Sequence, residues 1–479
     1  MYIKRSYPKQ LGEKMEQVKK KKSKFFISKR DVDMTEGSIV RHLITFALPI
    51  LVGNAFQQLY HTFDTWVVGQ YVSNEAYAAV GSLGPVTRTF LGFFSGLSMG
   101  TNVVVSQHYG AREQEKVNKA VHTGIIMAVA FGIVFTVVGS ALTPFLLDLS
   151  DTPAEVRPDA EAYLAVYFSG IIGLLVYNIA AGTLRAVGDS KRPFIFLIIS
   201  AFLNVVLDLL FVVKFGLGVK GVAYATVIAQ TVSAVLAVLT LARSDSYIRL
   251  RIRDLKPDFS ILRKIFKVGL PAAIQMTITS FSNVFVQSYI NYFGPDFMSG
   301  WTAYNTIDAY ALLPMQALSG AATTFVGQNL GKNDVKRAKR GANIAAAIAA
   351  AMTIIISTPI MIFAPHIVQF LNKNGTPLVV EYGTLIIHWL TPFLALRCIN
   401  LVYGGSLRGA GNSRAYMIIS IISFVVFRRA YLYVVANFIS NTHVPIALSY
   451  PAGWIICSAL VLFYYQRVDL AKTRIVDKK

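Results

Sequence analysis

Long apolar runs separated by short polar connections dominate the sequence. A helix needs about 17 to 25 residues to cross a bilayer, and twelve runs reach that length. They lie near 43–68, 76–106, 120–143, 161–184, 193–213, 221–242, 265–292, 298–328, 341–363, 382–407, 415–438 and 445–466. The pattern therefore predicts an all-α, polytopic membrane protein with about 12 transmembrane helices.

The connections alternate in charge. Those that follow the second, fourth, sixth, eighth and tenth runs are rich in Lys and Arg, whereas the connections between them hold few, and 144–160 carries several acids. Basic loops remain on the cytosolic side of a membrane. Both termini are therefore expected in the cytosol, with the chain in the inner (plasma) membrane.

The second half of the chain repeats the first. Three pairs of residues keep an offset of 221 to 223 positions: Pro49 and Pro271, Gln107 and Gln328, and Arg185 and Arg408. Because each repeat holds an even number of helices, the halves share one orientation and are related by an axis along the membrane normal. This arrangement predicts two parallel-repeat six-helix lobes with a central cavity. The predicted domains are a basic cytosolic tail at 1–42, an N-lobe at 43–242, an inter-lobe cytosolic loop at 243–262, a C-lobe at 263–466 and a basic cytosolic tail at 467–479.

Composition narrows the class further. Of the 479 residues, 54% are hydrophobic and only 15% are charged, with a mean hydropathy of +0.51, which excludes a water-soluble surface. The net charge of +21 follows from the basic connections, so we expect the lipid bilayer and not nucleic acid as its partner. Cys398 and Cys457 lie inside apolar runs, which excludes a disulfide framework. The seven histidines are scattered and form no HExxH motif, so we expect neither an enzyme nor a bound cofactor.

The lysine-rich segment at 19–24 has no apolar stretch behind it and is not a signal peptide. Two interpretations of the region remain open: a native cytosolic tail, or a natural start at Met34.

Two acids lie well inside the spanning runs of the first half, Asp64 and Asp208. Ionisable residues at membrane depth are costly and are functional candidates by default. Gln57 and Tyr60 share a helix face with Asp64, and Asn204 shares one with Asp208.

The rise of about 1.5 Å per helical residue places Asp64, Asp208 and Thr226 at a similar level in the outer half of the membrane. Asn178 lies nearer the cytosolic side by the same count. The first three residues are therefore expected to meet, and Asn178 fits this site less well.

Several segments, in order and partly duplicated, resemble the multidrug and toxic compound extrusion (MATE) family. They are ALP at Pro49, DTWVVG from Asp64, SQHYGA, LRAVGDSKRP, LNVVLD from Leu203, GVAYATV from Gly221 and VGQNLGK. The resemblance runs from about Met34 to the last apolar run. It implies a V-shaped exporter that expels small amphipathic, often cationic, organic compounds in exchange for protons or sodium ions.

The polar residues match the DinF-like branch of that family. The resemblance implies an ion-coupling network in the N-lobe, with Pro49 allowing the first helix to bend. The counterparts of this network are Gln57, Tyr60, Asp64, Asn178, Asn204, Asp208 and Thr226. A sodium ion could be held by Asp64, Asn204, Asp208 and Thr226, or a proton by the carboxylates; the sequence leaves H⁺ and Na⁺ open.

The second half departs from the first at these positions. The repeat aligns Asp64 with Val286, Asn204 with Phe427 and Asp208 with Tyr431. The run 265–292 offers only Gln275 where the NorM branch has a glutamate, which makes a sodium site of that type in the C-lobe doubtful. Asp308 is expected to pair with Arg428 or, alternatively, to face the cavity.

One alternative function stays open: a flippase or exporter of lipid-linked saccharides or other lipid-like substrates. Twelve runs and the set of Asp64, Asn204 and Asp208 favour export of drug-like compounds. The chain is expected to act as a monomer.

Overall fold

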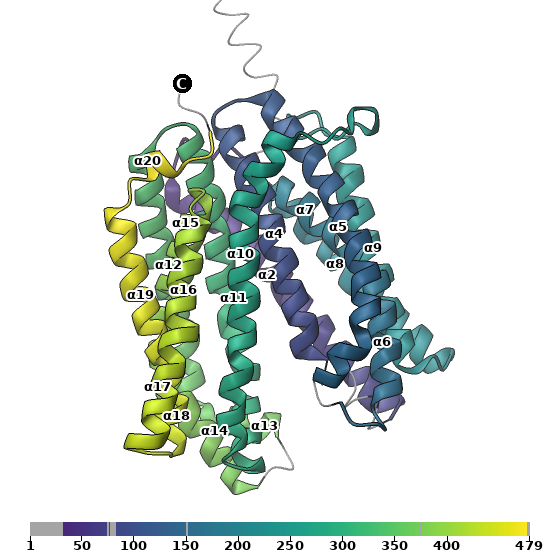
Figure 1. Cartoon of the computed structure of the whole chain (residues 1–479), viewed down its shortest axis with the longest axis vertical. Helices are drawn as coiled ribbons and strands as arrows, with labels where there is room; N and C mark the ends of the chain where they lie inside the picture. The colour runs from purple at the N-terminus through teal and green to yellow at the C-terminus, as the bar shows by residue number, and fades with distance from the viewer. Residues whose placement is uncertain (1–31, 74–75, 77–82, 150–151, 373–375, 477–479) are drawn as a thin grey trace, which may run out of the picture.

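The computed structural model describes residues 32–73, 76, 83–149, 152–372 and 376–476, and most of them are helical. Two bundles of helices meet at the end of the molecule that carries residues 32 and 476, and they diverge toward the opposite end (Figure 1). The molecule is therefore V-shaped, as the family resemblance implied.

The N-lobe contains six helical spans, two of them interrupted. They are α2 (Ile39–Tyr71), α4 (Gly84–Gly110), α5 (Gln114–Leu149), the pair α6 (Arg157–Ser169) and α7 (Ile171–Ala186), α8 (Lys191–Asp208) with the π-helical turn η1 (Leu209–Lys214), and α9 (Gly218–Ala242). The pair α6 and α7 is bent by 46° at Gly170, which packs against Val227 of α9. The single helix expected at 161–184 is thus broken.

The C-lobe repeats this plan with more interruptions. Its spans are α10 (Phe259–Asn291), α11 (Pro295–Gly331), α12 (Val335–Ile362), α14 (Pro377–Leu390) continued by α15 (Leu394–Gly409), α16 (Ser413–Ile421) continued by α17 (Arg428–Val434), and α18 (His443–Ala447) continued by α19 (Ser449–Arg467). The short helices α13 (Ala364–Leu371) and α20 (Leu470–Thr473) lie outside these spans.

Hydropathy and length agree with twelve spans. Among the described residues nine helices are long and apolar enough to cross a membrane, or ten if α6 and α7 count as one. The remaining two, α10 and α11, are 33 and 37 residues long but carry more polar side chains. The predicted all-α, twelve-helix architecture in two repeated lobes is confirmed.

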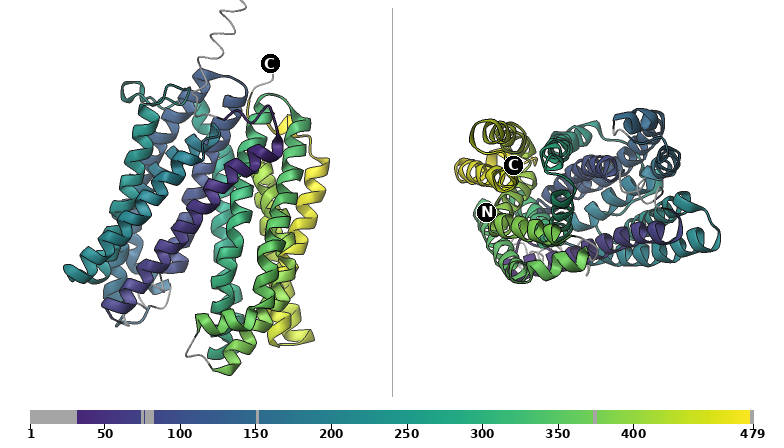
Figure 2. Two further views of the ribbon diagram at one scale, coloured as in Figure 1. Left: turned by 180° about the vertical axis from the view of Figure 1, so that it is seen from behind. Right: turned by 90° about the horizontal axis from the view of Figure 1, so that it is seen from below.

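The first helix of each repeat packs against both lobes. In α2, Leu43 and Phe46 belong to the C-lobe core around Met315, whereas Val67 and Val68 pack against N-lobe valines. Pro49 lies inside α2 between these two stretches. Figure 2 shows α2, in purple, running diagonally between the bundles.

The helix α10 repeats this exchange in the opposite direction. Ile261, Ile265 and Val268 belong to the N-lobe core, whereas Val286 packs in the C-lobe, and Pro271 lies between the two stretches. In both α2 and α10, the part of the helix before the repeated proline thus packs in the opposite lobe.

Candidate functional site

Three helices bring the predicted polar residues together inside the N-lobe. Asp64 comes from α2, Asn204 and Asp208 come from α8, and Thr226 comes from α9. All four side chains are buried, with exposed fractions of 5% or less. The predicted meeting of Asp64, Asp208 and Thr226 therefore occurs, at the junction of the first, fifth and sixth spans.

A chain of hydrogen bonds runs through Thr226. The side-chain amide of Asn204 donates to Thr226 Oγ1 at 3.5 Å, and Thr226 Oγ1 donates to Asp64 Oδ2 at 3.4 Å. The carboxyl group of Asp208 lies close enough to that of Asp64 for direct electrostatic interaction. Two buried carboxylates repel each other, so the site favours a bound proton or cation between them.

Asp64 Oδ1 and Asn204 Oδ1 are buried oxygens of this cluster that make no hydrogen bond to any described residue. The Asp208 carboxyl group has no partner among the described residues other than the Asp64 carboxyl group. Buried polar atoms are normally partnered. An all-oxygen set of this kind suits a proton or a hard cation such as sodium, because hard cations prefer oxygen ligands.

Tyr60 of α2 lies beside Asp64, and Gln57 of the same helix contacts Tyr60. Tyr60 is buried, interacts electrostatically with Asp64 and hydrogen-bonds with the side chains of Gln57 and Gln230. Tyr60 thus lies at the cluster, and Gln57 is connected to the cluster through Tyr60.

The structure adds three residues that the sequence analysis missed. Gln230 of α9 bonds to Tyr60, Tyr163 of α6 interacts electrostatically with both carboxyl groups, and His61 Nδ1 lies 3.8 Å from Asp64 Oδ2. Gln230 could have been found, because it follows Thr226 by four residues and so shares its helix face. Tyr163 offered no such spacing signal.

Asn178 is the one predicted network residue that the structure does not connect to the cluster. Its side-chain amide donates to the carbonyl of Leu174, one turn earlier in α7, at 2.9 Å. The described residues show no bond from Asn178 to the carboxylates, in line with its predicted depth.

The C-lobe acid Asp308 has a different partner from the expected one. Arg397 of α15 donates to both oxygens of Asp308, at 2.6 and 2.8 Å. The prediction that Asp308 pairs with Arg428 is therefore wrong, because α15 packs beside α11 while Arg428 is held by α10. Gln275 accepts a hydrogen bond from Arg408 at 3.3 Å, which is unsuited to a cation site.

The described residues contain no group of three or more His, Cys, Asp or Glu side chains placed to hold a metal ion. A sodium ion would thus have to rely on the hydroxyl and amide oxygens as well as the two carboxylates of the N-lobe cluster.

A second polar assembly joins the two lobes at the end that carries the termini. Gln328 of α11 donates to the carbonyl of Ala186 in the N-lobe at 2.8 Å, and Gln107 of α4 donates to the carbonyl of Gly409 in the C-lobe at 2.8 Å. The two repeated glutamines thus bridge the lobes in opposite directions. We call this assembly, with Gly110 and Gly331, the closure.

The backbones of α4 and α11 touch at the closure. A Cβ on Gly110 would lie 1.9 Å from the carbonyl oxygen of Gln328, and a Cβ on Gly331 would lie 2.0 Å from that of Gln107. Only glycine fits such an approach. The repeated glycine of each loop motif is thereby explained.

Both glutamines also hold an end of the chain. Gln328 Oε1 accepts from the backbone N–H of Met34 at 2.9 Å, and Gln107 Oε1 accepts from that of Ile475 at 2.6 Å. We call residues 32–37 the N-strap and residues 473–476 the C-strap. The predicted tails therefore contain ordered segments next to the first and last helices.

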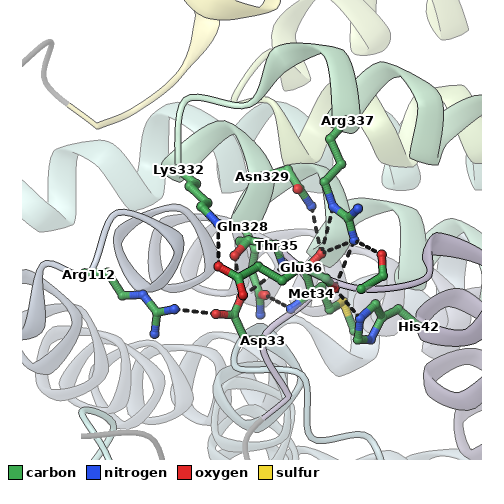
Figure 3. Close-up of polar contacts among 11 residues, drawn as sticks. Asp33, Met34, Thr35, Glu36, His42, Arg112, Gln328, Asn329, Lys332 and Arg337 are labelled. Carbon is green, nitrogen blue, oxygen red and sulfur yellow. Dashed lines mark hydrogen bonds and ion pairs between the residues drawn. The ribbon is translucent and has the colours of Figure 1, made fainter. Parts of the chain in front are cut away.

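Charged side chains fix the N-strap to both lobes (Figure 3). Asp33 forms an ion pair with Arg112 of the N-lobe, Glu36 pairs with Lys332 of the C-lobe at 2.9 Å, and Arg337 donates to the carbonyls of Met34, Glu36 and Gly37. Burial alone would raise the pKa of Asp33, but hydrogen bonds from Thr35 and the charges of Arg112 and Lys332 outweigh it and lower that pKa. The Asp33 carboxylate is thus ionised near neutral pH.

Both halves of the chain match one known protein family. The sequence matches the MatE family twice, over residues 49–210 and 271–434, and the two stretches begin at the repeated prolines. This chain belongs to the MATE family. Its members are membrane transporters rather than enzymes, so the predicted multi-pass transporter class is confirmed.

Individual MATE relatives cover nearly the whole chain. A Bacillus subtilis protein, "Probable multidrug resistance protein YpnP", is 27% identical over 91% of this chain and 97% of its own length. "Probable multidrug resistance protein NorM" of Thermotoga maritima is 26% identical over 84% of this chain and 86% of its own length. A solved structure titled "Outward-facing conformation of a multidrug resistance MATE family transporter of the MOP superfamily" shares the fold, with a TM-score of 0.87, 22% identity and coverage of 92% and 98%.

Proposed function

We propose that this chain is a secondary active multidrug exporter whose N-lobe carboxylates couple substrate export to inward movement of H⁺ or Na⁺. The main support for this coupling site is the buried contact of Asp64 with Asp208 and Thr226 at a junction of three helices. Two relatives that match this chain over most of their own length are named as probable multidrug resistance proteins, and this supports the multidrug assignment.

The cluster provides a place where a charge can be taken up and released. With both carboxyl groups ionised, Asp64 and Asp208 repel each other in a medium of low dielectric. A proton on one of them relieves the repulsion, and a sodium ion among the cluster's oxygens would do the same. Binding therefore changes how tightly α2 packs against α8 and α9.

The position of Pro49 connects this change to the rest of the molecule. A proline inside a helix removes one backbone hydrogen bond, so α2 bends there more easily than elsewhere. The part of α2 before Pro49 packs in the C-lobe, and the part after it carries Asp64. We infer that ion binding at Asp64 alters the angle at Pro49 and hence the packing between the lobes.

Transport by purified protein in liposomes, with imposed proton or sodium gradients, tests the proposal. Asp64→Asn keeps the size of the side chain but cannot ionise, so we expect gradient-driven efflux of a cationic dye to fall to the rate without a gradient. Asp296→Asn is the matched control, because Asp296 is an acid outside the cluster that contacts Thr376. Wild-type rates from Asp64→Asn under both gradients would show that the coupling site lies elsewhere.

A further inference from the structure

The C-lobe contains a buried arginine with no acidic partner. Arg428 begins α17 within the eleventh span, and only 3% of its surface is exposed. No described carboxylate lies within ion-pair distance of it, and the acid that we expected to pair with it, Asp308, pairs with Arg397 instead. The described residues therefore leave the positive charge of Arg428 unbalanced.

Neutral groups orient the guanidinium. Its Nη2 donates to Ser282 Oγ and to Asn283 Oδ1, both at 2.9 Å, and its carbon lies 4.9 Å from the centroid of the Tyr450 ring. The Nε–H is buried and has no partner among the described residues. These contacts hold the plane of the guanidinium in one orientation but leave its charge and one donor unsatisfied.

An isolated buried charge is costly inside a protein and more so at membrane depth. A residue needed only for packing could be apolar at lower cost. A guanidinium with a free donor is suited instead to a carboxylate or phosphate oxygen, with which it forms short charge-assisted hydrogen bonds.

The repeat places this arginine at the counterpart of the coupling site. Ser282 and Asn283 occupy the positions of Tyr60 and His61 in the first half, and Tyr450 follows the counterpart of Thr226 by one residue. The same junction of three helices thus holds two carboxylates in the N-lobe and a single guanidinium in the C-lobe.

One residue that contacts Arg428 reaches the surface of the protein. Asn283, which accepts from Arg428, is itself exposed on α10. The span is also irregular here, because the π-helical turn η4 (Ile422–Phe427) directly precedes Arg428. Such π-helical turns occur frequently at functional sites.

We propose that Arg428, with Ser282, Asn283 and Tyr450, forms an anion-binding site that takes one carboxylate or phosphate group of an amphipathic molecule. The acidic group comes either from a transported compound or from an anionic lipid head group. This binding site does not depend on the coupling role of Asp64, and it extends the substrate class to compounds that carry an acidic group besides a cationic one.

Binding of two dyes that differ at one group tests the site. Rhodamine 110 carries a free carboxylate, and rhodamine 123 is its methyl ester with the same cationic ring system. Full-length protein in phosphatidylcholine nanodiscs is titrated with each dye and followed by fluorescence anisotropy. We expect the acid to bind more tightly than the ester, and Arg428→Met to weaken the acid about tenfold or more while leaving the ester unchanged.

Two variants serve as controls. Arg428→Lys keeps the charge but loses the planar fork, so it should retain part of the preference. Arg429→Met removes the neighbouring exposed arginine, which stacks on Phe285 at 3.5 Å and interacts electrostatically with Arg428, so it should weaken binding of the acid far less than Arg428→Met does. Unchanged binding of the ester shows that the fold of Arg428→Met is intact.

Nanodiscs that contain phosphatidylglycerol distinguish the two sources of the acidic group. If the lipid phosphate uses the site, phosphatidylglycerol should raise the thermal stability of wild type but not of Arg428→Met, and it should compete with rhodamine 110. The proposal is overturned if Arg428→Met matches wild type for both dyes and for the lipid. Equal loss of both dyes would also overturn it, because that result indicates an arginine needed only for folding.

Discussion

At the scale of single residues, Thr226 connects the amide and the carboxylate of the N-lobe cluster. Its hydroxyl accepts from Asn204 and donates to Asp64. One small side chain thus makes two bonds, and it is 4% exposed, so water does not readily replace it. The cluster should therefore be sensitive to loss of this single oxygen atom.

Thr226→Val removes the hydroxyl while keeping the shape of the side chain. A hydrogen bond to a charged group contributes about 1.5–3 kcal/mol, so we expect the initial rate of gradient-driven dye efflux to fall about tenfold or more. Thr226→Ser restores the hydroxyl and should recover most of the rate. Equal rates for the valine and serine variants would contradict a role for the oxygen.

The charge of Asp33 gives a prediction about pH. Its pKa is lowered in the folded protein, so the stability that it contributes is present above the ordinary aspartate pKa of about 4 and is lost only as the pH falls through the lower folded value. Between about pH 6 and 8 its charge therefore does not change.

We expect Asp33→Asn to leave the shape of the pH profile of efflux unchanged between about pH 6 and 8. Asp64→Asn, in contrast, should flatten that profile if the cluster takes up protons. Initial rates at a constant substrate gradient provide the measurement. A profile altered by Asp33→Asn would place a titrating group at the N-strap.

The two acids of the cluster were easier to predict from the sequence than the neutral residues around them. Asp64 and Asp208 were identifiable because an acid at membrane depth is rare, and helical spacing added Asn204 and Tyr60. Tyr163 offers no such signal, since a membrane protein contains many tyrosines that only pack. The pairing of Asp308 with Arg397 depends on which helices are neighbours in space, and the spacing of polar residues along the chain does not encode that.

At the scale of elements, the two straps explain why Gln107 and Gln328 recur in the repeat. Each glutamine uses its N–H to reach the opposite lobe and its oxygen to hold one end of the chain. For the lobes to separate at the end that carries the two straps, these bonds have to break. The bonds to the straps therefore contribute to the free-energy difference between the state in which the closure is intact and the state in which it is open.

Gln328→Ala should shift the population of the transporter toward the state in which the closure is open. It removes one bond to Ala186 and one to Met34, each contributing about 1 kcal/mol. Spin labels near the ends of α5 and α12 at the closure would report the change as a longer distance by double electron–electron resonance.

Gln287→Ala is the matched control, because Gln287 lies on α10 and bonds only to Asn291 of its own helix among the described residues. It should leave the distance distribution of wild type unchanged. A Gln328→Ala distribution identical to wild type would show that the glutamine does not stabilise the closure.

The approximate positions of the spans were predictable, but the breaks within them were not. Apolar runs locate the twelve spans because the membrane demands length and low polarity. The bend at Gly170 and the break at Thr391–Phe393 occur inside continuous apolar runs. Only Gly170 and Pro392 hint at them, and both residue types also occur in unbroken membrane helices; α2 itself continues through Pro49.

At the scale of the whole molecule, the exchange of helix segments ties the lobes together. The N-lobe core includes Ile261, Ile265 and Val268 of α10, which lie beyond the predicted lobe boundary at 242. An isolated first half that ends before α10 would expose this part of its core. The repeat in sequence is therefore not a division into two separately stable units.

An N-terminal fragment of residues 1–250 should be unstable and rapidly degraded when expressed alone. A fragment of residues 1–292 retains α10 and should accumulate to a higher level, although it is longer. Quantitative immunoblotting after a block of protein synthesis measures both half-lives. If the shorter fragment persists as long as the longer one, packing of α10 is not required for the N-lobe.

The contact of Gly110 with Gln328 has a mechanical consequence. It fixes a pivot at one end of α11, a helix of 37 residues and so about 55 Å in length. A rotation of about 10° at that point moves the far end by about 10 Å. A larger side chain at the pivot would push the two axes apart, so the absence of a single methyl group allows a small tilt to become a wide opening.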